Sequence, residues 1–310
     1  MKQRTLIGIP IFNEEDLLEK TLDSLYNAVK DDDIDILAYD DGSTDFTPKI
    51  LREKQKEWGN KLIINNHAYS LGYGKTIIDI LKFGCSNKGK YEYVITFDAD
   101  LQHNPETLSV ILETLRNKKH VDVISSSRYL DNNFVKNSIN VPVDRFLINM
   151  NITKLLNSLY SLNLTDSFSG FKGYRVCRVE SMFNMRDVGY SSPIEFWINT
   201  AFYNLFVVEV PTPLIYIKGR ESRGNEKPWK DRLNNYLNAF KTYAWEDSQR
   251  DYVNSIEPTM MSFINEDLKI YHENQDEFIT TFQYFWKRHK ESEKNIYSKE
   301  NMNNLEILSK

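Results

Sequence analysis

Two carboxylates, Asp98 and Asp100, follow an apolar run of the chain with a single residue, Ala99, between them. The run Tyr93–Phe97 has the length, and the β-branched and aromatic side chains, of a strand that is buried on both faces. Carboxylate oxygens at the end of such a strand can hold Mg²⁺ or Mn²⁺, and the small side chain between them lets a ligand approach the backbone. The alternative is that both are solvated turn residues, because aspartate is common where strands end.

The residues after the acidic pair have the features of a helix start. Asn104 is suited to the N-cap, Pro105 to the first helical position and Glu106 to the first turn, where a negative charge is favourable. The segment from Tyr91 to Glu106 is therefore predicted to run from a strand through an acidic loop into a helix.

The same order of strand, loop and helix repeats along the chain. Further strands are predicted at Thr5–Ile9, Ile34–Tyr39, Leu62–Asn65 and Asp122–Ser126. Helices are predicted after an Asn13 N-cap, at Thr47–Trp58, at Lys75–Cys85 and from Asn104 to Asn117. This alternation implies right-handed crossovers and an α/β fold, with a mostly parallel sheet covered by helices on both faces. Ligands bind beyond the carboxyl ends of the strands in such sheets, and each acidic or glycine-containing motif falls at such an end.

The composition is that of a globular protein, and it argues against some partners. Of the 310 residues, 41% are hydrophobic, which is enough for a sizeable core. The net charge of -5 argues against a nucleic-acid binder, which needs a basic surface. The two cysteines, Cys85 and Cys177, lie far apart in apolar or mixed segments, so we expect buried thiols in a reducing compartment.

Hydropathy predicts no membrane span. The residues after Met1 lack the apolar core of a signal peptide. The longest apolar stretch, Phe196–Val210, is interrupted by polar residues and is too short to cross a bilayer. We therefore expect a cytoplasmic protein that is either free or peripheral at the membrane.

Seven motifs, taken together and in order, carry a family resemblance. They read IPIFNEE, DDGSTD, LGYGK, ITFDADLQHNPE, SSSRY, DSFSGFKGYR and PLIYIKGRESRGNEK. This series resembles that of the family-2 inverting glycosyltransferases, and within that family it is most similar to the dolichyl- and polyprenyl-phosphate sugar synthases. The resemblance covers Lys2–Lys227. It implies the GT-A fold, in which a Rossmann-like nucleotide-binding half merges with an acceptor-binding half, and it implies a nucleotide-sugar donor with Mg²⁺ or Mn²⁺ as cofactor.

The first two motifs would bind the nucleoside. By resemblance, Pro10, Phe12 and Glu14 belong to the nucleoside pocket, and Asp40 contacts the base or the ribose. A carboxylate can accept hydrogen bonds from a base N–H or from ribose hydroxyls, while an aromatic edge covers the ring. The structural alternatives are a favourable charge at a helix N-terminus for Glu14 and a turn-forming side chain for Asp40.

The central motif and two basic residues would hold the cation and the diphosphate. Asp98, Asp100 and Gln102 match the positions that do so in the relatives, with Ala99 among them. Arg128, just after the predicted fifth strand, matches an arginine that contacts phosphate; the alternative is a surface ion pair.

Lys227 resembles a lysine near the diphosphate, in a late loop that departs from the pattern of the relatives. Glu226 stands where they have serine, and the arginines fall at Arg220 and Arg223. The phosphate contacts of this loop, and with them the type of acceptor, stay open.

The motif from Asp166 to Phe171 resembles the acceptor side. Within it Ser169 precedes Gly170, which would permit a close backbone approach, and the aromatic Phe171 could form the floor of the sugar site. Glu195, near the start of a helix predicted to open at Ser192, resembles an acid of the family. It is either a general base or a structural partner of Arg175 or Lys172, and the residues do not decide between the two roles.

These residues suit displacement at the anomeric carbon of a sugar whose leaving group is a nucleoside diphosphate. A cation on Asp100, with Arg128 and Lys227, would neutralise the charge that develops on the leaving group. A lipid phosphate, such as a polyprenyl or dolichyl phosphate, is already an anion and needs no base. A hydroxyl of a glycan or a protein would need one, such as Glu195.

Other classes of protein fit less well. A non-catalytic nucleotide-sugar binding protein would use the same pocket and release no product. A sugar-1-phosphate nucleotidyltransferase should have an early glycine-rich basic loop, whereas Ile7–Asp16 is acidic. A dehydrogenase is not indicated, because no GxGxxG motif follows the first predicted strand.

The sequence predicts a catalytic domain at residues 1–228 and a helical C-terminal extension at residues 229–310. Apolar residues recur at helical spacing in Leu233–Ala244 and again in Phe278–His289. We expect these two helices to pack on the catalytic domain or on a second subunit; the alternative is a surface that touches a membrane. The end, Glu291–Lys310, is polar enough to be partly disordered.

Overall fold

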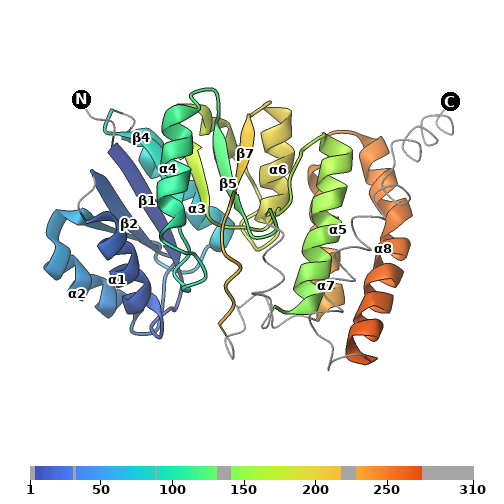
Figure 1. Cartoon of the computed structure of the whole chain (residues 1–310), viewed down its shortest axis with the longest axis horizontal. Helices are drawn as coiled ribbons and strands as arrows, with labels where there is room; N and C mark the ends of the chain where they lie inside the picture. The colour runs from blue at the N-terminus through green and yellow to red at the C-terminus, as the bar shows by residue number, and fades with distance from the viewer. Residues whose placement is uncertain (1–3, 31–32, 88, 131–140, 218–227, 274–310) are drawn as a thin grey trace.

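A seven-stranded sheet forms the centre of the computed structural model (Figure 1). The structure describes residues 4–30, 33–87, 89–130, 141–217 and 228–273. The strands are β1 (Arg4–Ile11), β2 (Ile34–Asp40), β3 (Leu62–Asn66), β4 (Tyr91–Thr96), β5 (Val123–Ser127), β6 (Lys172–Arg175) and β7 (Val207–Pro211). Their order is β3-β2-β1-β4-β6-β5-β7, and β6 alone among them runs antiparallel to its neighbours. The predicted mostly parallel sheet is confirmed.

Helices cover both faces of this sheet. The helices of the described residues, including those that stand beside the sheet, are α1 (Leu18–Val29), α2 (Thr47–Trp58), α3 (Tyr73–Ser86), α4 (Thr107–Asn117), α5 (Val143–Tyr160), α6 (Ser192–Phe202), α7 (Trp229–Tyr243) and α8 (Asp247–Glu273). Short 3-10 helices lie at Gly59–Lys61, Val176–Arg178 and Glu180–Asn184.

Side chains that alternate along each strand build two separate cores. On β1, Ile7 and Ile9 pack with buried residues of α1, α2 and α4, whereas Leu6 packs on the other face with residues of α3, α5 and α6. Gly8 faces α3, where an added Cβ would lie 2.1 Å from Ile80 Cγ2, so the glycine lets this helix approach the sheet closely. Period-two burial on both faces is the reason these runs form central strands.

The C-terminal helical extension is confirmed in the described part of the chain. Helices α7 and α8 stand beside α5 at the side of the sheet (Figure 1), and Leu233, Leu237 and Ile264 belong to the same core as α5 and α6. None of the helices within the described ranges is long and apolar enough to cross a membrane. The helix expected at Phe278–His289 and the polar end lie outside the described residues.

Three expectations from the sequence are wrong in detail. Asn13 is not an N-cap: it has a left-handed backbone (φ 50°), and α1 begins five residues later. Cys177 is exposed rather than buried, although Cys85 is buried as expected. Helix α4 begins at Thr107, so Asn104 lies before its cap, where its Oδ1 accepts the backbone N–H of Glu106 at 3.0 Å.

Candidate active site

The residues expected around the nucleoside lie together at the carboxyl ends of β1 and β2. Pro10 pairs with Tyr39 in the sheet, and Phe12 and Glu14 follow directly in the loop after β1. Asp40 ends β2; it is buried, and its Oδ1 accepts the backbone N–H of Ser43 at 3.0 Å. The structure therefore brings these four predicted positions to one corner of the sheet, and Asp40 also fulfils its turn-forming alternative.

Hydrogen bonds brace the two loops of this corner against each other. Asn13 donates its backbone N–H to Ser43 Oγ at 2.7 Å, and its Oδ1 accepts the backbone N–H of Thr44 at 2.7 Å. The backbone N–H of Glu14 donates to Thr47 Oγ1 at 2.7 Å. These contacts span about thirty residues of sequence, and they explain why Asn13 does not cap its own helix.

Asp98, which follows β4 next to β1, is held on both carboxylate oxygens. Tyr73 donates its hydroxyl to Oδ1 at 3.1 Å, and His103 Nε2 lies 3.4 Å from Oδ2. Burial and the neighbouring Asp98 raise the pKa of Tyr73 well above its usual value, so its hydroxyl keeps the proton that it donates. Gly170 lies against the same carboxylate, because an added Cβ would be 2.5 Å from Asp98 Oδ2 and 2.7 Å from Tyr73 Oη.

His103 is a neutral histidine that packs next to the Asp98–Asp100 loop. Its ring stacks on Phe171 with centroids 4.8 Å apart and meets Phe97 edge-on at 5.4 Å. Burial lowers the pKa of His103 to about 4. Its Nδ1 accepts the backbone N–H of Asp98 at 2.9 Å, which assigns the ring proton to Nε2, on the side of the Asp98 carboxylate. Phe171 thus supports the acidic loop from below.

Asp100 lies in a turn that presents its carboxylate at the end of β4. Leu101 adopts a left-handed backbone (φ 60°), which is uncommon for a non-glycine residue and occurs often at functional sites. This turn lets the backbone N–H of Gln102 donate to Asp100 Oδ1 at 3.0 Å. The carbonyl of Ala99 accepts Thr21 Oγ1 at 2.9 Å, which anchors the loop to α1.

The charges of the acidic loop fit a divalent cation. Burial raises the pKa of Asp98; burial and then the charge of Asp98 raise the pKa of Asp100, so a cation between them would relieve an unfavourable arrangement. No group of three or more His, Cys, Asp or Glu side chains suited to a metal occurs among the described residues. One or two carboxylates completed by phosphate oxygens and water are, however, the usual way to bind Mg²⁺. Asp98 and Asp100 therefore suit a cation that arrives with a diphosphate.

Arg128 follows β5 and forms an ion pair with Asp166, but not at the surface. Its Nε and Nη2 donate to the two oxygens of Asp166 at 2.6 and 2.9 Å, and Asn149 Nδ2 donates to Oδ1 at 2.8 Å. Asp166 is completely buried. Burial alone would raise the pKa of Asp166, but the Arg128 charge and these hydrogen bonds lower it, so the carboxylate stays ionised. The surface-pair interpretation of Arg128 is wrong.

Lys172, a buried basic residue at the start of β6, lies close enough to Asp166 and to Asp98 to feel both charges. Its Nζ donates to the backbone carbonyl of Ser169 and lies 5.3 Å from the centroid of the Trp197 ring. Burial lowers the pKa of Lys172 to about 8, although the charges of Asp166 and Asp98 oppose this shift. The sequence did not single out this residue as part of the site.

Glu195 lies on α6, where it binds backbone rather than a basic side chain. Its Oε2 accepts the backbone N–H groups of Arg186 and Asp187 at 2.8 and 2.6 Å, and the side chain is buried. Burial raises its pKa, although these two hydrogen bonds oppose the shift. The predicted partners Arg175 and Lys172 bind elsewhere, so that structural alternative is wrong in its partner.

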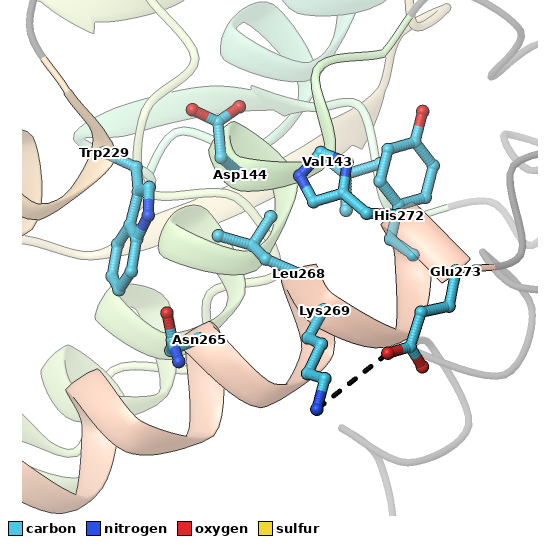
Figure 2. A pocket seen from close by; sticks show the side chains of 9 residues that line it. Val143, Asp144, Trp229, Asn265, Leu268, Lys269, His272 and Glu273 are labelled. Carbon is cyan, nitrogen blue, oxygen red and sulfur yellow. Dashed lines mark ion pairs between the residues drawn. The ribbon is translucent and has the colours of Figure 1, made fainter.

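Other parts of the chain do not join this site. Lys227, with the loop that carries Arg220 and Arg223, lies outside the described residues. A groove of about 730 Å³ opens between the first turns of α5 and α7 and the end of α8 (Figure 2). It is lined by Val143, Asp144, Trp229, Asn265, Leu268, Lys269, Tyr271, His272 and Glu273. It contains none of the predicted site residues, and the acidic loop remains the candidate centre.

Gly170→Ala tests whether the space beside Asp98 matters. The new Cβ must displace Asp98 or Tyr73, and we expect kcat/KM to fall by about 10²-fold, because ångström-scale displacement of a binding group has effects of that size. Gly89→Ala is the matched control, since an added Cβ there meets nothing within 4 Å. Equal activity of the two variants would show that the position of Asp98 is not critical.

The sequence is similar to a known protein family and to several of its members. A model of glycosyl transferase family 2 matches residues 6–181, more than half of the 310 residues. An undecaprenyl-phosphate mannosyltransferase from Micrococcus luteus is 28% identical over 222 residues, which cover 71% of this chain and 87% of that protein. A UDP-N-acetylglucosamine–dolichyl-phosphate N-acetylglucosaminyltransferase from Methanococcus voltae is 27% identical over 231 residues, which cover 70% of this chain and 87% of that protein.

The fold also matches solved structures. Glucosyl-3-phosphoglycerate synthase from Mycobacterium tuberculosis, crystallised with Mn²⁺, UDP and glucosyl-3-phosphoglycerate, has a TM-score of 0.55 over 80% of this chain and 82% of that one. The two sequences are 16% identical, so this likeness shows the shared fold alone.

Proposed function

The chain belongs to glycosyl transferase family 2, and on that basis we propose that it transfers a sugar from a nucleoside-diphosphate sugar to a polyprenyl phosphate. It is a glycosyltransferase with the GT-A fold. The observation that carries the proposal is the Asp98–Asp100 loop at the carboxyl end of β4, beside the corner formed by β1 and β2. The Micrococcus and Methanococcus relatives are named for polyprenyl-type phosphate acceptors, which supports the same class of acceptor here.

In the proposed reaction the chain binds the donor at the corner of the sheet and the diphosphate at the acidic loop. Pro10, Phe12, Glu14 and Asp40 would surround the nucleoside. Asp98 and Asp100, with Gln102 in the same turn, would hold Mg²⁺ or Mn²⁺, which when bound would neutralise charge on the diphosphate. The M. tuberculosis synthase that shares the fold was crystallised with UDP and Mn²⁺, which supports this choice of ligands.

The positive charge of Arg128 is fixed before the substrate arrives. Because Asp166 holds the guanidinium by two hydrogen bonds and is itself buried, Arg128 cannot swing away from the site at low cost. A charge fixed in this way stabilises a developing negative charge without reorganisation, so we assign Arg128 to the leaving diphosphate. The acceptor phosphate would attack from the opposite face of the sugar, which inverts the anomeric centre, and an anion needs no general base.

Glu195 therefore has a structural task that can be separated from base catalysis. In Glu195→Gln the amide oxygen can still accept both backbone N–H groups, so we expect kcat within about threefold of the unmodified protein. In Glu195→Ala the two N–H groups lose their acceptor, and we expect a loss of about 1–3 kcal/mol in the free energy of unfolding for each group left unsatisfied, with reduced transfer. A general base would give the other pattern, in which glutamine and alanine reduce kcat equally while stability is kept.

The proposed function is tested by nucleoside diphosphate release from UDP- and GDP-sugars, with Mg²⁺ or Mn²⁺ and with or without a short polyprenyl phosphate. Release that requires the cation, one donor and the lipid phosphate would establish the activity. If the protein binds the donor but transfers the sugar only to glycan or protein hydroxyls, the acceptor class in the proposal is wrong. If it binds no donor, the whole proposal is overturned. We further propose residues 1–228 as the catalytic domain and residues 229–310 as its helical extension.

A further inference from the structure

We infer that Tyr73 is a positioning residue, which fixes the carboxylate of Asp98 for the donor-binding role assigned above; this inference rests on the proposed function. Tyr73 is the first residue of α3, and its hydroxyl donates to Asp98 Oδ1 at 3.1 Å across 25 residues of sequence. Its ring is stacked with that of Tyr190, with centroids 6.4 Å apart and planes 12° from parallel. The tyrosine therefore reaches the acidic loop from a different element of the fold.

The backbone just before Tyr73 is held by one buried carboxylate, Asp41. This side chain accepts Ser70 Oγ at 2.7 Å and the backbone N–H groups of Leu71 and Gly72 at 2.8 and 2.9 Å. Asp41 is 3% exposed and directly follows β2. The end of a central strand thus fixes the loop from which α3 begins.

A partly buried histidine, His67, links the same carboxylate to the helix itself. His67 Nδ1 lies 2.6 Å from Asp41 Oδ1, and its Nε2 lies 2.9 Å from Asp79 Oδ2 on α3. Lys75 pairs with Asp79 one turn earlier on the helix. The orientation of α3, and with it the direction of the Tyr73 side chain, is set by this network.

The loop around Val188 contacts both glycines that flank Tyr73. The backbone N–H of Gly74 donates to the carbonyl of Val188 at 2.9 Å. Gly72 has φ +99°, and a Cβ there would lie 2.3 Å from the same carbonyl, while a Cβ on Gly74 would lie 2.5 Å from Asp187 O. Glycine on both sides of Tyr73 is thus required by close contact with a loop that Glu195 anchors.

Because Tyr73 is held in this way, it fixes the orientation of the Asp98 carboxylate. Tyr73 occupies one oxygen and His103 faces the other, and Gly170 leaves the space that this orientation needs. Without the tyrosine hydroxyl, Asp98 Oδ1 loses the hydrogen bond that holds the carboxylate in this orientation. Metal-binding carboxylates depend on hydrogen bonds from neighbouring side chains to keep them oriented toward the cation. The Tyr73 hydroxyl would do this for Asp98.

Tyr73→Phe tests the inference, because it removes the hydroxyl and keeps the ring that stacks on Tyr190. The probe is Mn²⁺ titrated calorimetrically into the full chain with UDP or GDP, whichever the unmodified protein binds. We expect the dissociation constant for Mn²⁺ to rise by about tenfold, as for loss of one hydrogen bond to a charged group, and the Tm to change little. Tyr69→Phe is the control, since this tyrosine of the same loop is 69% exposed.

A double variant tests whether Asp41 acts on Asp98 by positioning Tyr73. If Asp41 acts through Tyr73, Asp41→Asn should weaken Mn²⁺ binding alone but add nothing in the Tyr73→Phe background. Unchanged Mn²⁺ affinity in Tyr73→Phe would overturn the positioning role, and additive effects in the double variant would overturn the action of Asp41 through Tyr73. Absence of nucleotide and Mn²⁺ binding in the unmodified protein would instead overturn the proposed function, so the two failures are distinguishable.

Discussion

Asp100→Ala is expected to reduce kcat/KM for sugar transfer by at least about 10³-fold, because a bound cation supplies several kcal/mol of charge stabilisation to the leaving group. Loss of the negative charge should not by itself reduce stability. Burial and the negative charge of Asp98 raise the pKa of Asp100, which means that the folded protein disfavours its ionised form relative to the unfolded chain. Near neutral pH the charge of this carboxylate therefore opposes folding, so Asp100→Asn, which removes the charge and keeps an acceptor for the Gln102 N–H, should leave the Tm unchanged or raise it.

The two readouts separate the functional interpretation from the structural one. If Asp100 were only a turn residue, transfer would persist in both the alanine and the asparagine variant, and alanine would lower only the Tm, because it leaves the Gln102 N–H without its acceptor. Asp100→Asn is the control that keeps the shape and the acceptor oxygen. It should lose transfer as fully as the alanine variant, and both should lose the rise in Tm that Mn²⁺ with a nucleoside diphosphate gives the unmodified protein. Retained transfer in the asparagine variant would remove Asp100 from the site.

The first five strands were predictable from sequence, and β1, β2, β4 and β5 stand out because they are buried on both faces, whereas β6 and β7 were not predicted. Predicted Ile34–Tyr39 and Leu62–Asn65 are each one residue shorter than β2 and β3, and Thr47–Trp58 agrees with α2 at both ends. Helix α8 was not predicted. Its apolar positions are diluted by many charged residues and Pro258 stands in its middle, so the sequence lacks the pattern that made α2, α3 and α7 visible. Helix α5 was not predicted either, because its buried residues lie on all sides and give no apolar stripe.

Site residues that directly follow a strand were predictable from sequence. Those that act through a partner far away in the sequence were not. Asp98 and Asp100 stand out because a buried strand stops at them. Tyr73 carries no such mark: in LGYGK it reads as an aromatic between two glycines, and its partner lies 25 residues away. Asp41 was hidden for a similar reason, since its backbone partners lie 30 and 31 residues later in a loop without regular structure.

The second large effect is expected in the Arg128–Asp166 pair. Asp166→Ala leaves the Arg128 guanidinium without its carboxylate, and it also removes the acceptor for Asn149 Nδ2 and for the backbone N–H of Phe168. Breaking a buried ion pair from one side costs about 3–5 kcal/mol in the free energy of unfolding. Urea unfolding measures this loss. Arg178→Ala is the control, because Arg178 pairs with Asp122 at 2.8 Å but is half-exposed, and its loss should cost no more than about 1 kcal/mol.

A double variant then separates the stability of this pair from its role in transfer. Replacing a buried ion pair by apolar side chains of similar volume is often neutral, so Arg128→Met combined with Asp166→Leu should recover the stability that the unpaired Arg128 charge costs in Asp166→Ala. It should not recover the part lost with the acceptor of Asn149 Nδ2 and the Phe168 N–H. Transfer should not recover, because no fixed positive charge then faces the leaving diphosphate. A stable double variant that transfers sugar at the normal rate would show that the pair only supports the fold. A stable and inactive one would establish that the buried Asp166 exists to hold the Arg128 charge in the site.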